Sequence, residues 1–363
     1  MNNYLFTSES VGEGHPDKVC DYIADSVLDA CLAQDPGSHV ACEVLAKDHR
    51  VIVAGELKTT AVLDVPRLVR DAVLEIGYVD ADQPFNPDQV EVTNLLGVQS
   101  ADIDRGVSNP EQGAGDQGIM FGYACGETPE LLPLPIVLAH RLARTLAEER
   151  KAGRIPWARP DAKTQVTVRY VDGQPVEVTD VVVSTQHAAG TAPGLIRQYV
   201  EQTLLPQALG TFHREGIRLF VNPTGEFVIG GPVGDCGVTG RKIIVDTYGG
   251  AARHGGGAFS GKDASKVDRS AAYFARHVAR EIVKSGIAKK AELQVAYAIG
   301  VAQPVSLFVE TFGTGDPEAA KEFAGGFDFR PAAITERLGL RAPLFRRTTN
   351  YGHFGKSYLP WES

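Results

Sequence analysis

Several features are scarce or missing in this chain of 363 residues. Its five cysteines stand at irregular spacings and form no CxxC pair, so they predict neither a disulfide framework nor a zinc site. The start, MNNYLFTSES, lacks both the charged and the apolar part of a signal peptide, and no apolar run reaches about 18 residues. We therefore expect a cytoplasmic protein without a membrane-spanning segment.

Positive charge is also in short supply. The net charge of −9 argues against a protein that coats nucleic acid or anionic membranes. The length predicts about two to three domains, and 43% hydrophobic with 22% charged residues is ordinary for a globular protein. Against this acidic background, the basic cluster within residues 241–269 indicates a local pocket for an anion.

The most informative stretch runs from Asp235 to Ser270 and combines glycines, aspartates and seven basic or histidine side chains. Glycine lets a backbone approach a ligand closely, lysine and arginine bind phosphate, and carboxylates suit Mg²⁺. We interpret the stretch as a polyphosphate site; the alternative is a solvated charged loop. It is not a P-loop, although Gly256-x4-Gly261-Lys262 is close to one. Asp263 stands where that motif needs Ser or Thr, and no strand immediately precedes it.

The order helix, strand, strand, helix occurs three times along the chain. Helices are expected over 17–34, 65–76, 135–151, 194–209, 266–285 and 317–323. Strands are expected over 39–46, 50–60, 165–171, 176–187, 292–301 and 305–313, with a turn at Asp172-Gly173. This repetition predicts an α+β fold of three similar units. The runs VVVSTQH and YAIGVAQ are apolar on both faces, which favours an oligomer, although packing between domains would bury the same surface.

Two further features admit two interpretations each. In Gly14-His15-Pro16-Asp17-Lys18, the helix start could bind phosphate with His15 as proton donor, or Asp17 could simply cap the helix. Glu43 and Glu56 lie on adjacent predicted strands, where they could bind a cation or an amine, or face the solvent.

The stretch 99–116 is acidic and contains glycine and serine. It is either a gating loop or a long surface connection.

Six motifs together resemble one family closely. They are GHPDK (14–18), GAGDQG (113–118), RPDAKTQVT (159–167), NPTGEFVIGGP (222–232), GDCGVTGRK (234–242) and GGGAFSGKDASKVDRSAAY (255–273). The resemblance is to the methionine adenosyltransferases, or S-adenosylmethionine synthetases, and it runs in order from Phe6 to Trp361. It implies three similar α+β domains in a pseudo-threefold arrangement. Their implied limits are 1–98, 111–231 and 232–363, with a mobile gating loop at 99–110.

The resemblance also implies an activity. The family makes S-adenosylmethionine from ATP and L-methionine: the methionine sulfur attacks ribose C5′, the triphosphate leaves intact, and it is then hydrolysed to pyrophosphate and phosphate. Two Mg²⁺ and one K⁺ per site are implied. So is a homo-oligomer, commonly a tetramer, with active sites between two subunits. Neither nucleic acid nor a membrane is expected as a partner.

Site residues follow from matching the motifs residue by residue. The catalytic residues would be His15, Lys163, Arg241, Lys242 and Lys262. The residues that bind ATP would be His15, Asp116, Asp161, Lys163, Phe227, Asp235, Arg241, Lys242, Ala258 and Lys262. Those that bind methionine would be Glu56, Gln99, Asp235 and Lys266. Asp17 and Asp268 would hold Mg²⁺, and Glu43 would serve K⁺.

Departures from the family pattern are few. Glu226 stands where a basic residue is common, so it receives no phosphate role, and the gate is a few residues shorter than in familiar members. Arg241, Lys242, Lys262 and Lys266 would form a clamp for the anion. A non-catalytic nucleotide-binding subunit would be expected to have lost such charged residues, yet all are present. A kinase or NTPase would need a P-loop or a kinase signature, and the sequence has neither.

Overall fold

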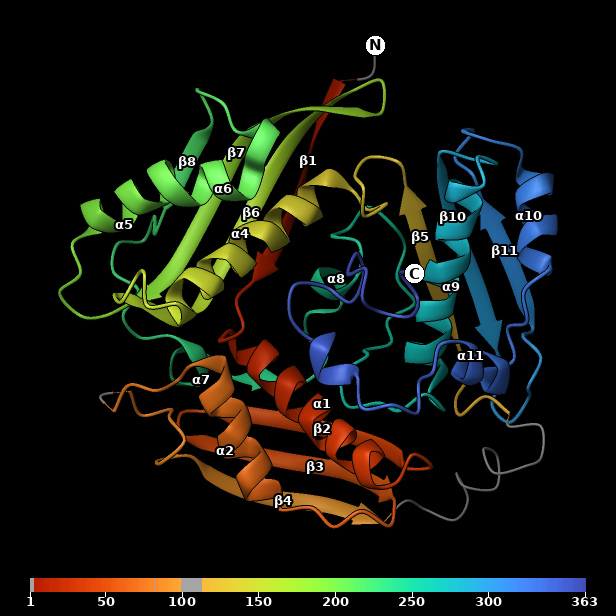
Figure 1. The fold of residues 1–363 in the computed structure, drawn as a ribbon, viewed down its shortest axis with the longest axis horizontal. Helices are drawn as coiled ribbons and strands as arrows, with labels where there is room; N and C mark the ends of the chain where they lie inside the picture. Colours follow the sequence, from red (N-terminus) through yellow and green to blue (C-terminus); the bar gives the residue numbers. More distant parts are fainter. Residues whose placement is uncertain (1–2, 82, 99–112) are drawn as a thin grey trace.

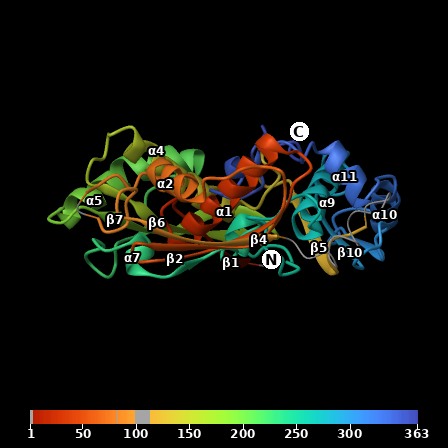
Figure 2. The same ribbon diagram turned by 90° about the horizontal axis from the view of Figure 1, so that it is seen from below.

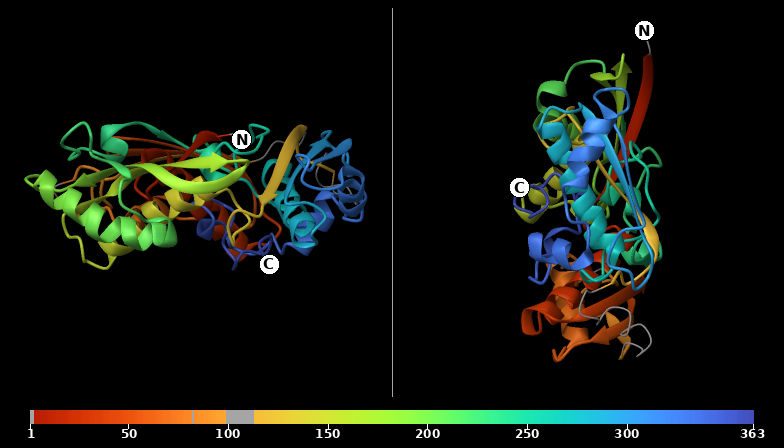
Figure 3. Two further views of the ribbon diagram at one scale, coloured as in Figure 1. Left: turned by 90° about the horizontal axis from the view of Figure 1, so that it is seen from above. Right: turned by 90° about the vertical axis from the view of Figure 1, so that its right-hand side faces the viewer.

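A computed structural model describes residues 3–81, 83–98 and 113–363. They form three sheets, each with helices against one face (Figure 1). The molecule is flattened, with the long helices on one side and the strands on the other (Figures 2 and 3). The predicted α+β class is confirmed. No helix in the described ranges combines the length and the apolar content needed to cross a bilayer.

The first sheet has the strand order β4-β3-β2-β9 and is covered by two helices. Its elements are β2 (His39–Lys47), β3 (Arg50–Lys58), β4 (Glu91–Val98), β9 (Gly237–Val238), α1 (Pro16–Gln34) and α2 (Val65–Ile76). The side chain of Asp64 caps the start of α2 by accepting the Arg67 N–H at 3.1 Å, and Gly77 ends the helix with φ +104°. The predicted helices and the two predicted strands are confirmed here.

The second sheet has the order β1-β6-β7-β8. Its elements are β1 (Asn3–Val11), β6 (Ala158–Val171), β7 (Gln174–His187), β8 (Arg218–Val221), α4 (Leu134–Lys151), α5 (Pro193–Tyr199) and α6 (Leu205–Leu209). The turn predicted between β6 and β7 is confirmed: Asp172 and Gly173 both have positive φ, 50° and 76°, as a two-residue hairpin requires. The single helix predicted over 194–209 is wrong in detail, because a π-helical turn (Val200–Leu204) separates α5 from α6.

The third sheet has the order β11-β10-β5, with α9 packed along it. Its elements are β5 (Gly118–Cys125), β10 (Lys290–Tyr297), β11 (Ser306–Glu310), α9 (Val267–Lys284), α10 (Pro317–Gly325) and α11 (Pro331–Arg337). β5 runs very close to α9, because a Cβ on Gly122 would lie 2.0 Å from the backbone of Ala275. Single helical turns α7 (Gly231–Gly234) and α8 (Ile243–Asp246) lie in the connection that carries the basic cluster.

Three strands join sheets that are formed mainly by other segments of the chain, and no local sequence pattern predicts this exchange. β1 precedes α1 in the chain but pairs with β6, and β5 pairs with β10. β9 joins the first sheet beside β2 from far along the chain. No sheet is therefore confined to one of the segments 1–98, 111–231 and 232–363.

Two hydrophobic clusters fill the space between the helices and the sheets. One includes Val27 of α1, Phe274 of α9 and Trp361, so the first and third units share a core. The other lies inside the second unit and includes Leu142 and Val181. The helix α1 is therefore fixed relative to α9 by packing.

Apolar side chains remain on the faces of the sheets that no helix covers. Leu5, Leu45, Leu95, Ile119 and Phe308, which come from all three sheets, are 39–61% exposed. The strands lie together on one side of the molecule (Figure 2), and this side therefore offers apolar surface from each unit. This surface suits the oligomer expected from the sequence.

The end of the chain packs against α9 near the middle of the molecule (Figure 1). Trp361 is fully buried and stacks on Tyr273, with 3.8 Å between the ring centroids. The carboxylate of Glu362 accepts two hydrogen bonds from Arg276, at 2.9 and 3.1 Å, and lies 3.2 Å from Arg280. These contacts anchor the chain end to α9.

We expect Glu362→Ala to lower the free energy of unfolding by about 3 kcal/mol, because it leaves a buried guanidinium without its partner. Urea denaturation at fixed protein concentration measures the change. Glu281→Ala is the matched control on the same helix: it removes an exposed pair with Lys284 and should cost less than about 1 kcal/mol. Equal losses in the two variants would contradict the anchor.

Candidate active site

The motif GHPDK forms the turn between β1 and α1. Pro16 occupies the first position of the helix, and His15 is the N-cap, with its Nδ1 accepting the N–H of Asp17 at 3.2 Å. The interpretation that Asp17 caps the helix is therefore wrong. The N-cap is His15, and the Asp17 carboxylate binds other partners.

His15 is neutral at physiological pH. Burial, reinforced by the charge of Lys242, lowers its pKa to about 3. Because Nδ1 accepts a hydrogen bond, the proton of the neutral ring lies on Nε2. His15 therefore presents an N–H donor at Nε2.

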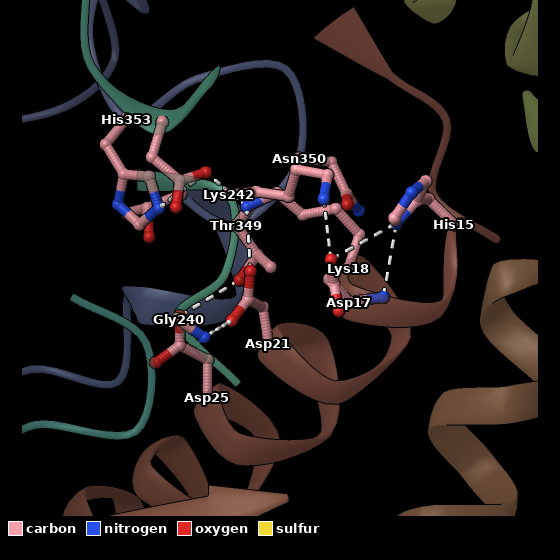
Figure 4. Close-up of polar contacts among 12 residues, drawn as sticks. His15, Asp17, Lys18, Asp21, Asp25, Gly240, Lys242, Thr349, Asn350 and His353 are labelled. Carbon is pink, nitrogen blue, oxygen red and sulfur yellow. Dashed lines mark hydrogen bonds and ion pairs between the residues drawn. The ribbon is translucent and has the colours of Figure 1, made fainter. Parts of the chain in front are cut away.

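Asp17 is the buried centre of a first group of charged residues (Figure 4). It accepts hydrogen bonds from Lys242 Nζ at 2.6 Å and from the Val238 N–H at 3.1 Å, and Arg241 Nη1 lies 3.7 Å away. Burial acts to raise its pKa, but the bond from Lys242 and the Val238 N–H outweigh burial and hold the pKa below its ordinary value. Asp17 is therefore a carboxylate at neutral pH.

A hollow of about 190 Å³ opens beside this centre. Its lining includes His15, Asp161, Lys163, Phe227 and Asp235. β6 supplies Asp161, whose pKa burial raises to about 6, and Lys163. The other two come from the connection before α7 and from the residue that ends α7. The structure thus gathers these five predicted residues around one cavity.

A second group lies where α9 begins. Lys262 Nζ donates to the Asp268 carboxylate at 2.7 Å. A Cβ on Gly257 would lie 2.1 Å from that carboxylate, so only glycine fits there. Ala258 lies close to Gly240, where a Cβ would approach it to 2.5 Å, so the loop of the second group touches the loop of the first.

Three further predicted residues lie around the second group. Glu43 on β2 is close enough to Lys262 for that charge to act on it, and burial raises its pKa. Glu56 on β3 lies diagonally across from it on the same uncovered face, so the two carboxylates repel each other. Asp116 precedes β5, and the Cβ position of Gly118 is 3.9 Å from Asp268.

The remaining predictions differ in outcome. The ammonium of Lys266 is bound by Asp263 at 2.6 Å and not by Asp268. Glu226, which received no role, is exposed. Gln99 and the predicted gate at 99–110 lie outside the described residues.

Ammonium–carboxylate pairs are the common feature of both groups. Lys242 pairs with Asp17, and Lys262 pairs with Asp268. A polyphosphate that arrives with a divalent cation can replace both partners at once, because the phosphates bind the ammonium groups and the metal binds the carboxylates. The arrangement therefore suits a chelated polyphosphate better than a bare anion or a bare metal.

Sequence reasoning missed the buried residues behind these groups. Asp21 accepts the Gly240 N–H, and Lys18 forms ion pairs with Asp21 and Asp246. Burial raises the pKa of Asp246, even though the charge of Lys18 opposes that shift. The available signal was an aspartate at every fourth position from Asp17 onward, which places the carboxylates on one face of a helix.

The low pKa of His15 gives a direct prediction. The folded protein binds this proton less readily than the unfolded chain, so neutral His15 contributes stability that is lost as pH falls below about 6.5 toward its folded pKa. In an NMR titration, we expect the ring signals assigned through His15→Asn to stay unchanged between pH 7 and 5. A transition centred near 6.5 would contradict the burial argument.

Comparison with known proteins agrees with the geometry. Three domain models match in order: the N-terminal domain of S-adenosylmethionine synthetase over residues 3–101, the central domain over 111–227 and the C-terminal domain over 229–363. The chain is 56% identical to S-adenosylmethionine synthase of Akkermansia muciniphila, over 99% of this chain and 95% of that protein. It is 53% identical to the same-named protein of Sorangium cellulosum (100% and 88% covered) and 54% identical to that of Nocardia farcinica (99% and 95% covered).

Proposed function

This chain belongs to the S-adenosylmethionine synthetase family, and we propose that its two groups of charged residues clamp the triphosphate of ATP while methionine displaces it. Its activity is that of a methionine adenosyltransferase: the methionine sulfur attacks ribose C5′ of ATP, and the triphosphate is then hydrolysed to pyrophosphate and phosphate. The observation that supports the clamp is the pairing of each of two lysines with one aspartate.

In this proposal, His15 donates a hydrogen bond to the departing oxygen. When the C5′–O bond breaks, negative charge grows on that oxygen, and a neutral imidazole with its proton on Nε2 can donate a hydrogen bond to it. A protonated imidazole would not accept the Asp17 N–H at Nδ1. The cap therefore keeps His15 in the tautomer that the reaction needs.

The cations of the clamp bind the phosphate chain and stabilise the charge on the leaving group. We assign this role to Lys163, Arg241, Lys242 and Lys262. Removing one pre-positioned donor of this kind typically costs about 3 kcal/mol of transition-state stabilisation. Because the triphosphate leaves carbon and not phosphorus, the reaction needs charge stabilisation and no P-loop.

Metal ions are used by this family, and the residues present fit Mg²⁺ at two positions. Among the described residues no cluster of three or more His, Cys, Asp or Glu could hold a metal alone. Mg²⁺ commonly binds through one or two carboxylates together with phosphate oxygens. We propose that Asp17 and Asp268 each hold one Mg²⁺ with the triphosphate. Bound Mg²⁺ would neutralise charge on the phosphate oxygens.

A K⁺ ion is proposed beside Glu43. The neighbouring carboxylate of Glu56 adds negative charge on the same face, which favours a cation there. Other oxygen ligands would have to come from outside this pair.

The substrates occupy the hollow and the face next to it. For the nucleotide, we propose contacts from Asp161 and Asp235, stacking on Phe227, and contacts from Asp116 and Ala258. Phe227 is half-buried in the wall of the hollow, as a stacking platform should be.

For methionine, we propose Glu56, Gln99, Asp235 and Lys266. Glu56 or Asp235 would face the ammonium group.

Assembly from several copies also forms part of the proposal. Among the described residues, neither Lys262 nor Asp268 of the second group lines the hollow beside Asp17. The uncovered sheet faces carry apolar side chains in all three units. We propose a homo-oligomer, commonly a tetramer, with active sites at the interface of two subunits. The cytoplasmic location, the domain limits and the gate at 99–110 stay predictions from the sequence.

The product assay tests the function as a whole. With ATP, L-methionine, Mg²⁺ and K⁺, we expect S-adenosylmethionine, pyrophosphate and phosphate in equal amounts, measured by mass spectrometry and phosphorus NMR. Omitting methionine or Mg²⁺ should abolish the sulfonium product, and replacing K⁺ by a larger organic cation should slow its formation. Release of ADP would overturn the proposal.

Lys262→Ala tests the clamp. We expect kcat to fall by about 100-fold, because a charge next to the leaving group is lost, while the unfolding temperature stays close to that of the unchanged protein. Lys284→Ala is the matched control, since this lysine is exposed and pairs with Glu281 on its own helix. A kcat near that of the control would contradict the assignment of Lys262.

A further inference from the structure

Helix α1 carries four buried aspartates on one face. Asp17, Asp21, Asp25 and Asp29 follow each other at every fourth position and are at most 8% exposed. Figure 4 shows the first three along the helix. Buried carboxylates are costly without partners, so each must be satisfied by a specific donor. For Asp17, Asp21 and Asp25, the donors include backbone N–H groups of the loops that carry the clamp.

Asp21 holds the loop of the first group. Its Oδ1 accepts the backbone N–H of Gly240 at 2.8 Å, and its other oxygen lies 3.0 Å from Lys18 Nζ. Gly240 has φ +76° and directly precedes Arg241 and Lys242. Glycine adopts many backbone conformations, so the hydrogen bond to Asp21 helps to fix the backbone at the residue before the two cations.

Asp25 holds the loop of the second group in the same way. Its Oδ1 accepts the backbone N–H of Gly261 at 2.9 Å, and Gly261 has φ +82° and directly precedes Lys262. Asp25 also binds Arg269 through two hydrogen bonds, at 2.7 and 2.8 Å, and Arg269 in turn donates to the carbonyl of Lys262 at 3.1 Å. The backbone at Lys262 is thus held at two points, the N–H of the preceding Gly261 and the carbonyl of Lys262 itself.

We propose that Asp21 and Asp25 are positioning residues that hold Lys242 and Lys262 for triphosphate binding, Asp21 through Gly240 and Asp25 through Gly261 and Arg269. The two aspartates are one helical turn apart, about 6 Å along the axis of α1, and the helix thereby sets the spacing of the two loops that they hold. Neither aspartate belongs to the clamp itself. This inference rests on the function proposed above.

Asp29 provides an internal control. It belongs to the same row and is also buried, but it accepts the backbone N–H groups of Phe345 and Arg346, at 3.0 and 2.9 Å. Those residues lie in neither group of the site. Asp29→Ala should therefore cost stability without changing the binding of phosphate.

Double-mutant cycles on the full chain test the proposal, with binding of inorganic tripolyphosphate in Mg²⁺ measured by calorimetry. We expect Asp21→Ala to weaken binding by about 10- to 100-fold, because a small misplacement of bound groups has effects of this size. In the Lys242→Ala background the same change should weaken binding at least about fivefold less, whereas in the Lys262→Ala background its effect should be unchanged. Asp25→Asn should show the reverse pattern and couple to Lys262.

The outcomes distinguish a failure of the positioning role from a failure of the proposed clamp. If Asp21→Ala and Lys242→Ala reduce affinity independently, the positioning role is overturned while the clamp stands. If Lys242→Ala itself leaves tripolyphosphate binding unchanged, the proposed clamp fails, and the positioning role fails with it. A loss of affinity in Asp29→Ala as large as in Asp21→Ala would also overturn the inference, because it would mark a general effect of stability. If Asp25→Asn does not fold, the Asp21 cycle decides alone.

Discussion

The buried ion pair between Asp25 and Arg269 connects the two helices on which the rest of the structure depends. Both side chains are almost completely inaccessible to solvent, and two hydrogen bonds join them. The guanidinium lies 4.2 Å from the ring centre of Phe345 and donates to Tyr273. Removing one member of such a pair leaves an uncompensated buried charge. The pair therefore fixes α1 relative to α9, and each of these helices begins beside one group of the active site.

Buried charge continues from this pair toward the start of α1. Lys18 is fully buried, and the pKa of its ammonium is held above the ordinary value because the attraction of Asp246 and Asp21 outweighs burial. Lys356, which is also buried, donates to three backbone carbonyls, and burial lowers its pKa to about 7. The interior behind the clamp is thus a polar network and not an apolar core. Such a network tolerates few alternative arrangements, because every member needs its partner.

Local sequence patterns were enough to find the long helices and the central strands, although they did not predict α11. The period of apolar residues located α1, α2, α4 and α9 to within one residue or so, because each buries one face against a sheet. Local patterns could not predict that β1 pairs with β6 or β5 with β10, since these partners lie far apart in sequence. The π-helical turn after Tyr199 likewise has no signal that a helical period would reveal.

The motifs predicted which residues belong to the proposed site, but not how these residues divide between its two groups. Spacing alone could not tell that Lys242 would meet Asp17 while Lys262 meets Asp268, because those pairings depend on the tertiary path of two loops. Of the two interpretations of the helix start, capping by Asp17 is wrong, because His15 occupies the N-cap, although carboxylates are common caps. The row of aspartates on α1 was visible in the sequence, but its partners are backbone N–H groups, which no sequence pattern marks.

The crossing of β1 has a consequence for biosynthesis. This strand leaves the ribosome before β6, which ends at Val171, so it must stay unpaired until β6 has been made. β5 stays unpaired for longer still, because its partner β10 begins only at Lys290. The three units therefore cannot fold one after another during synthesis, and pairing at such long separation is slow. A chain interrupted before residue 290 would expose strand edges, which makes such fragments prone to aggregate and to be degraded.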